Sequence, residues 1–172
     1  QQYFFCSASL QDIIRKYKLV YGDDFSHFAE MNAIQLNDTH PVISIPELIR
    51  LLTDLENVPF DDALEICKKV FSYTNHTILA EALEKWGQHL MVTTIPRVYD
   101  IIVKIDDALG RELAAKGVHG DKAKSMRIIQ HETVHMAYMA IFASRYVNGV
   151  AQLHSDILKN DVLKDWYAIY PE

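Results

Sequence analysis

Two short polar clusters stand out because their side chains could form hydrogen bonds to a ligand. The first cluster is Asn37-Asp38-Thr39-His40, and the second is Thr74-Asn75-His76-Thr77. Asn, Asp and His offer fixed donors and acceptors that match the hydroxyl groups of a sugar without a hydrophobic pocket. The same residue types also make turns and cap helices, so a purely structural role is the alternative interpretation of both clusters.

A third candidate is the run His131-Glu132-Thr133-Val134-His135, which spells HExxH. In zinc proteases this motif lies on a helix, where the two histidines bind the metal and the Glu activates a water molecule. The apolar stretch 128–146 predicts such a helix, but Tyr138 and Ile141 stand where a third-ligand motif has Gly and His. We keep a zinc metalloprotease as an alternative function and assign no metal ligand. The structural alternative places both histidines at the solvated start of a helix.

The two polar clusters follow short apolar runs that predict strands. Residues 33–37 and 70–74 are rich in β-branched, aromatic or other apolar side chains. Helices beginning near Pro46 and Pro59 are predicted between these strands. Because strands joined by helices are usually parallel neighbours, their carboxyl ends lie at one edge of the sheet, where open α/β sheets bind ligands. We therefore expect the polar clusters to meet.

Helical periodicity is predicted in several further stretches, so the expected fold class is α/β, predominantly helical with short parallel strands. These stretches are residues 9–17, a segment resuming near residue 80, and residues 96–117, 128–146 and 153–167. Residues 21–32 and 117–121 carry Gly, Asp and Asn and are predicted to be loops.

Composition excludes several classes of protein. A formal net charge of -6, without a cluster of Lys and Arg, argues against nucleic-acid binding. No apolar run is long enough to cross a bilayer, and no signal peptide is evident, so no membrane partner is expected. Cys6 and Cys67 lie far apart and give no disulfide framework, which favours a reducing, cytoplasmic location.

Four runs resemble, in order and spacing, signature segments of the glycogen (α-glucan) phosphorylase family. They are Ile34 to His40, Pro46 to Leu48, Tyr73 to Leu79 and Glu81 to Glu84, and further similarity is found at Ser7 to Arg15, Val147 to Ala151 and His154 to Leu158. Ala80 departs from the proline usual in the family. The resemblance implies part of a Rossmann-like glycosyltransferase domain. Residues 1–172 would be a single partial domain, truncated at both ends within the N-terminal catalytic half.

The resemblance implies phosphorolysis, in which inorganic phosphate splits the terminal α-1,4 link of a glucan and releases glucose 1-phosphate. By similarity, His76 is the catalytic residue, bounding the glucosyl subsite with its backbone carbonyl and imidazole. A carbonyl dipole aimed at a nascent oxocarbenium ion is a reasonable electrostatic device. The substrate-binding positions implied by the resemblance are Asp38, His40, Asn75 and Glu84.

The resemblance also implies the cofactor pyridoxal phosphate, which assists through its phosphate group. Val150 matches a position near this cofactor, and Gly149 would let the backbone approach closely. In the family the cofactor lysine lies beyond Glu172, so the isolated chain is expected to be inactive. The complete protein is expected to be a homodimer acting on an α-1,4-glucan and inorganic phosphate. A non-catalytic module that binds glucan or mediates assembly is the second alternative.

Overall fold

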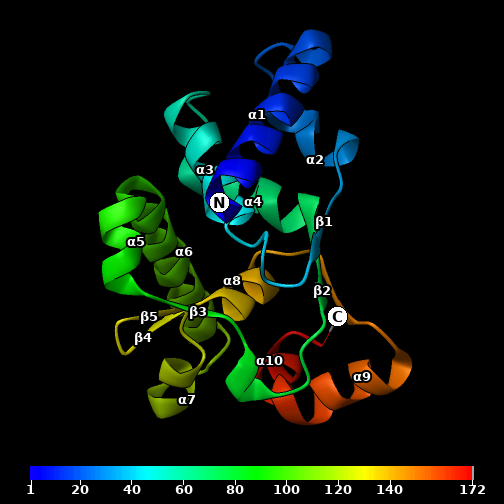
Figure 1. The fold of residues 1–172 in the computed structure, drawn as a ribbon, viewed down its shortest axis with the longest axis vertical. Helices are drawn as coiled ribbons and strands as arrows, with labels where there is room; N and C mark the ends of the chain where they lie inside the picture. Colours follow the sequence, from blue (N-terminus) through cyan, green and yellow to red (C-terminus); the bar gives the residue numbers. More distant parts are fainter. Residues whose placement is uncertain (172) are drawn as a thin grey trace.

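The computed structural model describes residues 1–171 and shows helices arranged around two small sheets (Figure 1). The α-helices are α1 (Gln2–Tyr21), α2 (Phe28–Met31), α3 (Ser44–Asp54), α4 (Phe60–Val70), α5 (Gln88–Thr94), α6 (Pro96–Ala115), α7 (Gly120–Ser125), α8 (Met136–Phe142), α9 (Gln152–Ile157) and α10 (Lys164–Ile169). Shorter turns are η1 (Phe25–His27), η2 (Ala80–Ala82) and the π-helical η3 (Leu158–Val162). Within residues 1–171, every helix is too short or too polar to cross a membrane.

The first sheet has three parallel strands in the order β1 (Ile34–Asn37), β2 (Phe71–Asn75) and β6 (Tyr146–Gly149). Its register places Asn37 opposite Thr74, and Asn75 opposite Gly149. The two strands predicted from sequence are confirmed, and they are parallel neighbours as expected. The second sheet is antiparallel, in the order β3 (Lys85–Gly87), β5 (Thr133–His135) and β4 (Ile129–Gln130).

The core forms where α3 packs against α1, α4 and α6, and where β2 lies between its two parallel neighbours. Phe71 and Tyr73 of β2 are fully buried, and so is most of α3. Pro46 lies in the first turn of α3, where its missing N–H breaks no helical hydrogen bond. Asp61 in the first turn of α4 complements the positive end of the helix dipole. These signals explain why both connecting helices form where the sequence predicts them.

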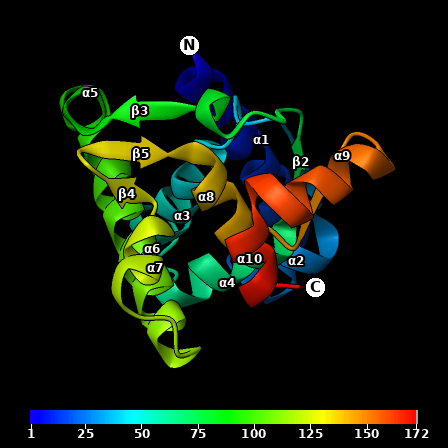
Figure 2. The same ribbon diagram turned by 90° about the horizontal axis from the view of Figure 1, so that it is seen from below.

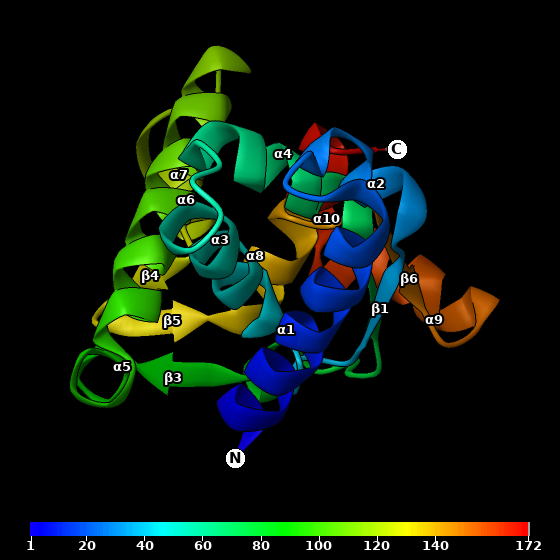
Figure 3. The same ribbon diagram turned by 90° about the horizontal axis from the view of Figure 1, so that it is seen from above.

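The two sheets lie on different sides of this helical core. Figures 2 and 3 place α6 and the antiparallel sheet on one side of the molecule and α9 on the other, and Figure 3 shows β6 beside α9. The long helix predicted over residues 96–117 is confirmed as α6, and it lies beside α5. The loops predicted over residues 21–32 and 117–121 contain the short helices η1 and α2 and the start of α7.

The single helix predicted over residues 128–146 is wrong, although Met136–Phe142 within this range is helical. The segment instead forms β4, β5 and α8 and then enters β6. His131 and Glu132 have φ angles of 48° and 58° and form the turn between β4 and β5. Short buried strands and buried helices both give apolar runs in the sequence, so periodicity alone does not distinguish a strand from a helix here.

Other predicted helices differ in extent. The first helix is longer than residues 9–17 and begins at Gln2. The segment near residue 80 is only the turn η2, followed by β3. The helix predicted over residues 153–167 is divided into α9, η3 and α10, because a π-helical turn interrupts it.

Candidate functional site

The two polar clusters meet at the carboxyl edge of the parallel sheet. The backbone N–H of Asp38 donates to the carbonyl of Thr74 at 2.9 Å, which extends the pairing of β1 and β2 beyond the last strand residue. On the other side of β2, Asn75 pairs with Gly149 at the end of β6. The segments that begin at Asp38, His76 and Val150 therefore leave the sheet from the same edge. The sequence predicted the first two segments there, and the structure adds the third.

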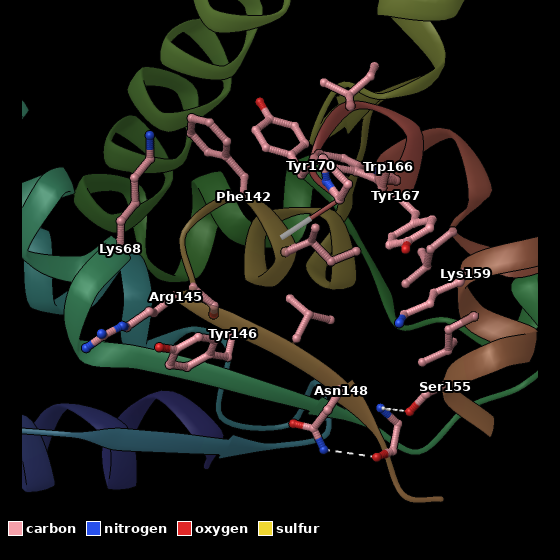
Figure 4. Close-up of a pocket in the computed structure, with 18 of the residues that line it drawn as sticks. Lys68, Phe142, Arg145, Tyr146, Asn148, Ser155, Lys159, Trp166, Tyr167 and Tyr170 are labelled. Atoms are coloured by element: carbon pink, nitrogen blue, oxygen red, sulfur yellow. Dashed lines mark hydrogen bonds between the residues drawn. The ribbon is translucent and has the colours of Figure 1, made fainter. Parts of the chain in front are cut away.

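Polar side chains also link the three strands across one face of the sheet. Gln35 Nε2 donates to Thr74 Oγ1 at 2.9 Å, and Thr74 Oγ1 donates to Asn148 Oδ1 at 3.2 Å. Asn148 Nδ2 donates in turn to the carbonyl of Gly149 at 2.9 Å (Figure 4). These bonds connect the ends of β1, β2 and β6, so the loops that follow have fixed starting points.

Asn75 is fully buried, and both ends of its amide are bonded within the chain. Its Nδ2 donates to Tyr73 Oη at 2.8 Å, and its Oδ1 accepts from the backbone N–H of Thr77 at 2.8 Å. Burial raises the pKa of Tyr73, and the charges of Asp38 and Glu84 raise it further, so the phenol stays protonated at neutral pH. The Asn75 amide thus shapes the turn that carries His76.

His76 and His40 are exposed, so both imidazoles face solvent at this edge. Asp38 has a φ angle of 62°, in the left-handed region that Asp tolerates better than most residues. Its Oδ1 accepts from the backbone N–H of Thr39 at 2.7 Å, which stabilises the tight turn into α3.

Glu84 comes from the start of the antiparallel sheet rather than from the parallel one. Its Oε1 accepts from Trp86 Nε1 at 3.0 Å and from Gln2 Nε2 at 3.4 Å. Its Oε2 is buried and has no hydrogen-bond partner within residues 1–171. A buried carboxylate oxygen is a strong acceptor, so a donor from a ligand would be well matched to it.

The end of β6 is held tightly against α9. Gly149 N–H donates to Ser155 Oγ at 3.1 Å (Figure 4), and Val150 N–H donates to His154 Nδ1 at 3.1 Å. A Cβ at Gly149 would lie 2.9 Å from the backbone N of Ser155 and 3.0 Å from the His154 ring, so only glycine fits. The Val150 side chain is 56% exposed. The sequence did not single out His154 by itself, because an isolated histidine gives no functional signal.

A cavity of about 600 Å³ lies beside β6, but it is not the predicted site (Figure 4). Lysine side chains that line it lie over aromatic rings. Lys68 Nζ is 4.5 Å from the centre of the Phe142 ring, and Lys159 Nζ is 5.2 Å from the centre of the Tyr167 ring. The predicted substrate residues do not line this cavity, which reaches the sheet edge only near Gly149. We place the candidate site at the edge, because the segments that carry Asp38, His40 and His76 leave the parallel sheet there.

The HExxH run does not have the geometry of a zinc site. His131 lies in the β-turn, and His135 ends β5 and stacks on Tyr138 with ring centres 5.0 Å apart. The two histidines are therefore not one helical turn apart on a common helix. Within residues 1–171, no three His, Cys, Asp or Glu side chains are grouped to bind a metal ion. The helix on which the metalloprotease alternative depended is absent from this segment.

The fold and the edge together define an α/β chain whose parallel sheet presents polar side chains where such sheets bind ligands. The profile of the family described as Phosphorylase, carbohydrate phosphorylase, matches residues 1–172. The chain therefore belongs to the carbohydrate phosphorylase family, as its motifs predicted.

Among similar curated proteins is the H isozyme of α-glucan phosphorylase from Solanum tuberosum, which is 46% identical over 99% of this chain. The muscle form of glycogen phosphorylase from Rattus norvegicus is 44% identical over 99% of the chain. Glycogen phosphorylase 2 from Dictyostelium discoideum is 45% identical over the same share. The alignments cover 22%, 22% and 18% of these relatives, so the chain spans about a fifth of their length.

Proposed function

We propose that this chain is part of an α-glucan phosphorylase, which transfers a terminal α-1,4-linked glucosyl unit to inorganic phosphate and gives glucose 1-phosphate. The observation that carries the proposal is the convergence of the Asp38, His76 and Val150 segments at one sheet edge. This edge occurs in a chain that is 46% identical to a protein named α-glucan phosphorylase. We further propose that residues 1–172 are a partial domain of a cytoplasmic, homodimeric protein.

His76 is the proposed catalytic residue, bounding the glucosyl group with its backbone carbonyl and imidazole. The exposed side chain follows directly after the buried Asn75, so the backbone at His76 starts from a fixed point. A carbonyl dipole held in place before the reaction can stabilise positive charge that develops on the sugar. Because the Asn75 amide is used within the chain, its proposed contribution to substrate binding is to hold this turn.

Asp38, His40 and Glu84 are the proposed pocket residues beside the sugar. The turn at Asp38 and the exposed His40 supply polar groups from the β1 side of the edge. The buried Oε2 of Glu84 supplies an acceptor from the other sheet. Sugar hydroxyls can donate to such acceptors while accepting from neighbouring N–H groups, so this combination suits a carbohydrate.

The end of β6 fits one side of a cofactor site for pyridoxal phosphate. Val150 presents an exposed apolar side chain, and its neighbour Gly149, which is closely packed, has no side chain. Such an apolar surface can contact a flat aromatic ring. When bound, pyridoxal phosphate would supply its phosphate group for proton transfer. The contribution of this chain is the contact surface at Val150.

The complete reading frame should be assayed with maltodextrin and inorganic phosphate. We expect glucose 1-phosphate to form only when phosphate is present. His76→Ala keeps the backbone carbonyl but removes the imidazole, and we expect this loss to lower kcat by about 100-fold, as when other preorganised polar groups are removed. The matched control is His119→Ala, because His119 is exposed beside α7 and caps no helix with its side chain. Unchanged turnover in His76→Ala would refute the site, and a wild-type protein that makes no glucose 1-phosphate would refute the function.

A further inference from the structure

His154 joins the loops that follow β2 and β6. The side chain lies in α9 and is only 6% exposed. Its Nδ1 accepts from the Val150 N–H at 3.1 Å, and its Nε2 lies 3.4 Å from the carbonyl oxygen of Thr77. In a neutral ring, a nitrogen that accepts from a backbone N–H carries no proton, so the proton is on the other nitrogen. Nε2 is therefore the donor to Thr77.

The position of the His154 ring is fixed on the β6 side. Gly149 packs so closely that a Cβ there would lie 3.0 Å from both Cγ and Nδ1 of the ring. The neighbouring Ser155 accepts from the Gly149 N–H at 3.1 Å and holds α9 against the strand (Figure 4). Gly149 is in turn paired with Asn75 in the sheet. The ring thus has little freedom to move away from Thr77.

Thr77 is held from two directions. Its N–H donates to Asn75 Oδ1 at 2.8 Å, and its carbonyl faces His154 Nε2. His76 lies between the buried Asn75 and Thr77, whose backbone makes these two hydrogen bonds. The peptide groups on both sides of His76 are therefore restrained. A one-residue segment restrained at both ends has few backbone orientations available, which is the condition for preorganised catalysis.

We propose that His154 is a positioning residue, which holds Thr77 and thereby sets the direction of the His76 imidazole. The inference rests on the proposed function of His76. His154 itself touches no substrate, and its ring acts as a rigid link between the β6 and β2 loops. A residue with this role affects the rate of the chemical step more than the binding of phosphate, because only the geometry at His76 changes.

The test uses two substitutions in the complete protein. His154→Asn places an oxygen near the former Nδ1 and can accept from Val150, but it is too short to reach Thr77. His154→Gln places an amide nitrogen near the former Nε2 and can reach Thr77. We expect kcat to fall about 10- to 100-fold in the Asn variant, as for a small misplacement of a reacting group, with KM for phosphate within about 2-fold. The Gln variant should recover most of this loss.

The matched control is Gln152→Ala on the same helix. Gln152 is exposed, and within residues 1–171 its side chain donates only to Asp156, at 2.9 Å, so its loss leaves the Thr77 contact intact. We expect wild-type kcat in this variant. Amide hydrogen exchange, measured by mass spectrometry on the peptide containing residues 76–79, should be faster in His154→Asn and unchanged in Gln152→Ala.

A double-mutant cycle separates positioning from general loss of structure. In a His76→Ala background, His154→Asn should lower kcat by less than about 3-fold, because coupled residues are not additive. An equal loss in both backgrounds, or wild-type kcat in His154→Asn, would overturn the inference while leaving the proposed function standing. If the wild type makes no glucose 1-phosphate, the proposed function fails, and the hydrogen exchange result still decides whether His154 restrains the Thr77 segment.

Discussion

Replacing Gly149 by alanine is the sharpest test of how the end of β6 is built. The new Cβ would lie 2.9 Å from the backbone N of Ser155 and 3.0 Å from Cγ and Nδ1 of His154. Neither group can yield as the end of a flexible side chain would. The Ser155 N–H already donates to the carbonyl of Ala151 at 2.9 Å, and the His154 ring is buried.

The size of the effect follows from two opposing contributions. Adding a methyl group to a tightly packed site lowers the free energy of unfolding by about 1–3 kcal/mol. Replacing Gly by Ala stabilises a protein by about 0.4–1 kcal/mol where the backbone suits alanine, because the unfolded chain loses freedom. Gly149 is not among the glycines with positive φ, so this gain applies. The net expectation is a loss of about 1–2 kcal/mol.

Urea unfolding at 25 °C measures this loss. With a slope of about 2 kcal/mol per molar urea, the midpoint should fall by about 0.5–1 M. Gly87→Ala is the matched control, because a Cβ at Gly87 in β3 would have no atom within 4 Å and its φ is negative. This control should unfold at or slightly above the wild-type midpoint. A Gly149→Ala midpoint equal to that of Gly87→Ala would refute the packing argument.

Two further predictions concern charge. Glu47 is fully buried and accepts from Arg50 Nε at 2.8 Å and from Ser7 Oγ at 2.6 Å. Glu47→Ala should therefore lower the free energy of unfolding, measured in urea, by about 3 kcal/mol. A loss below about 1 kcal/mol would contradict a structural role for Glu47. Burial, followed by the charges of Lys85 and His131, lowers the pKa of His135. The unfolded chain then binds the proton more readily, so stability is lost as pH falls below about 6.5. His135→Gln should weaken this dependence between pH 7.5 and about 5, and equal slopes would count against the assignment.

The parallel pairing of β1 and β2 could be predicted because several local signals agreed. Apolar runs ended in polar clusters, and Pro46 and Pro59 marked the helices between them. Such signals act over a few residues, where sterics and helix capping decide the backbone. The meeting of Asp38 with Thr74 then followed from the rule that joined parallel strands end at one edge.

The third strand and the hairpin could not be predicted in the same way. The apolar pattern of residues 128–146 also fits a helix. β6 is a strand because it pairs with β2, and this pairing is not visible in its own sequence. His131 and Glu132 adopt positive φ angles because the hairpin requires a tight turn there. The local pattern does not reveal which strands pair with one another, so the sequence predicted a helix for the HExxH run, which forms a turn and a strand.

The sequence by itself determined the family, the two polar strand ends and the four longest helices, α1, α3, α4 and α6, because motif order and apolar spacing are local properties. Only the tertiary structure decided that Asn75 turns inward and that His154 meets Thr77, 77 positions away. The physical reason is that these contacts depend on the pairing of β2 with β6 and on the close packing of Gly149 against α9. That packing is what brings His154 to the loop carrying His76.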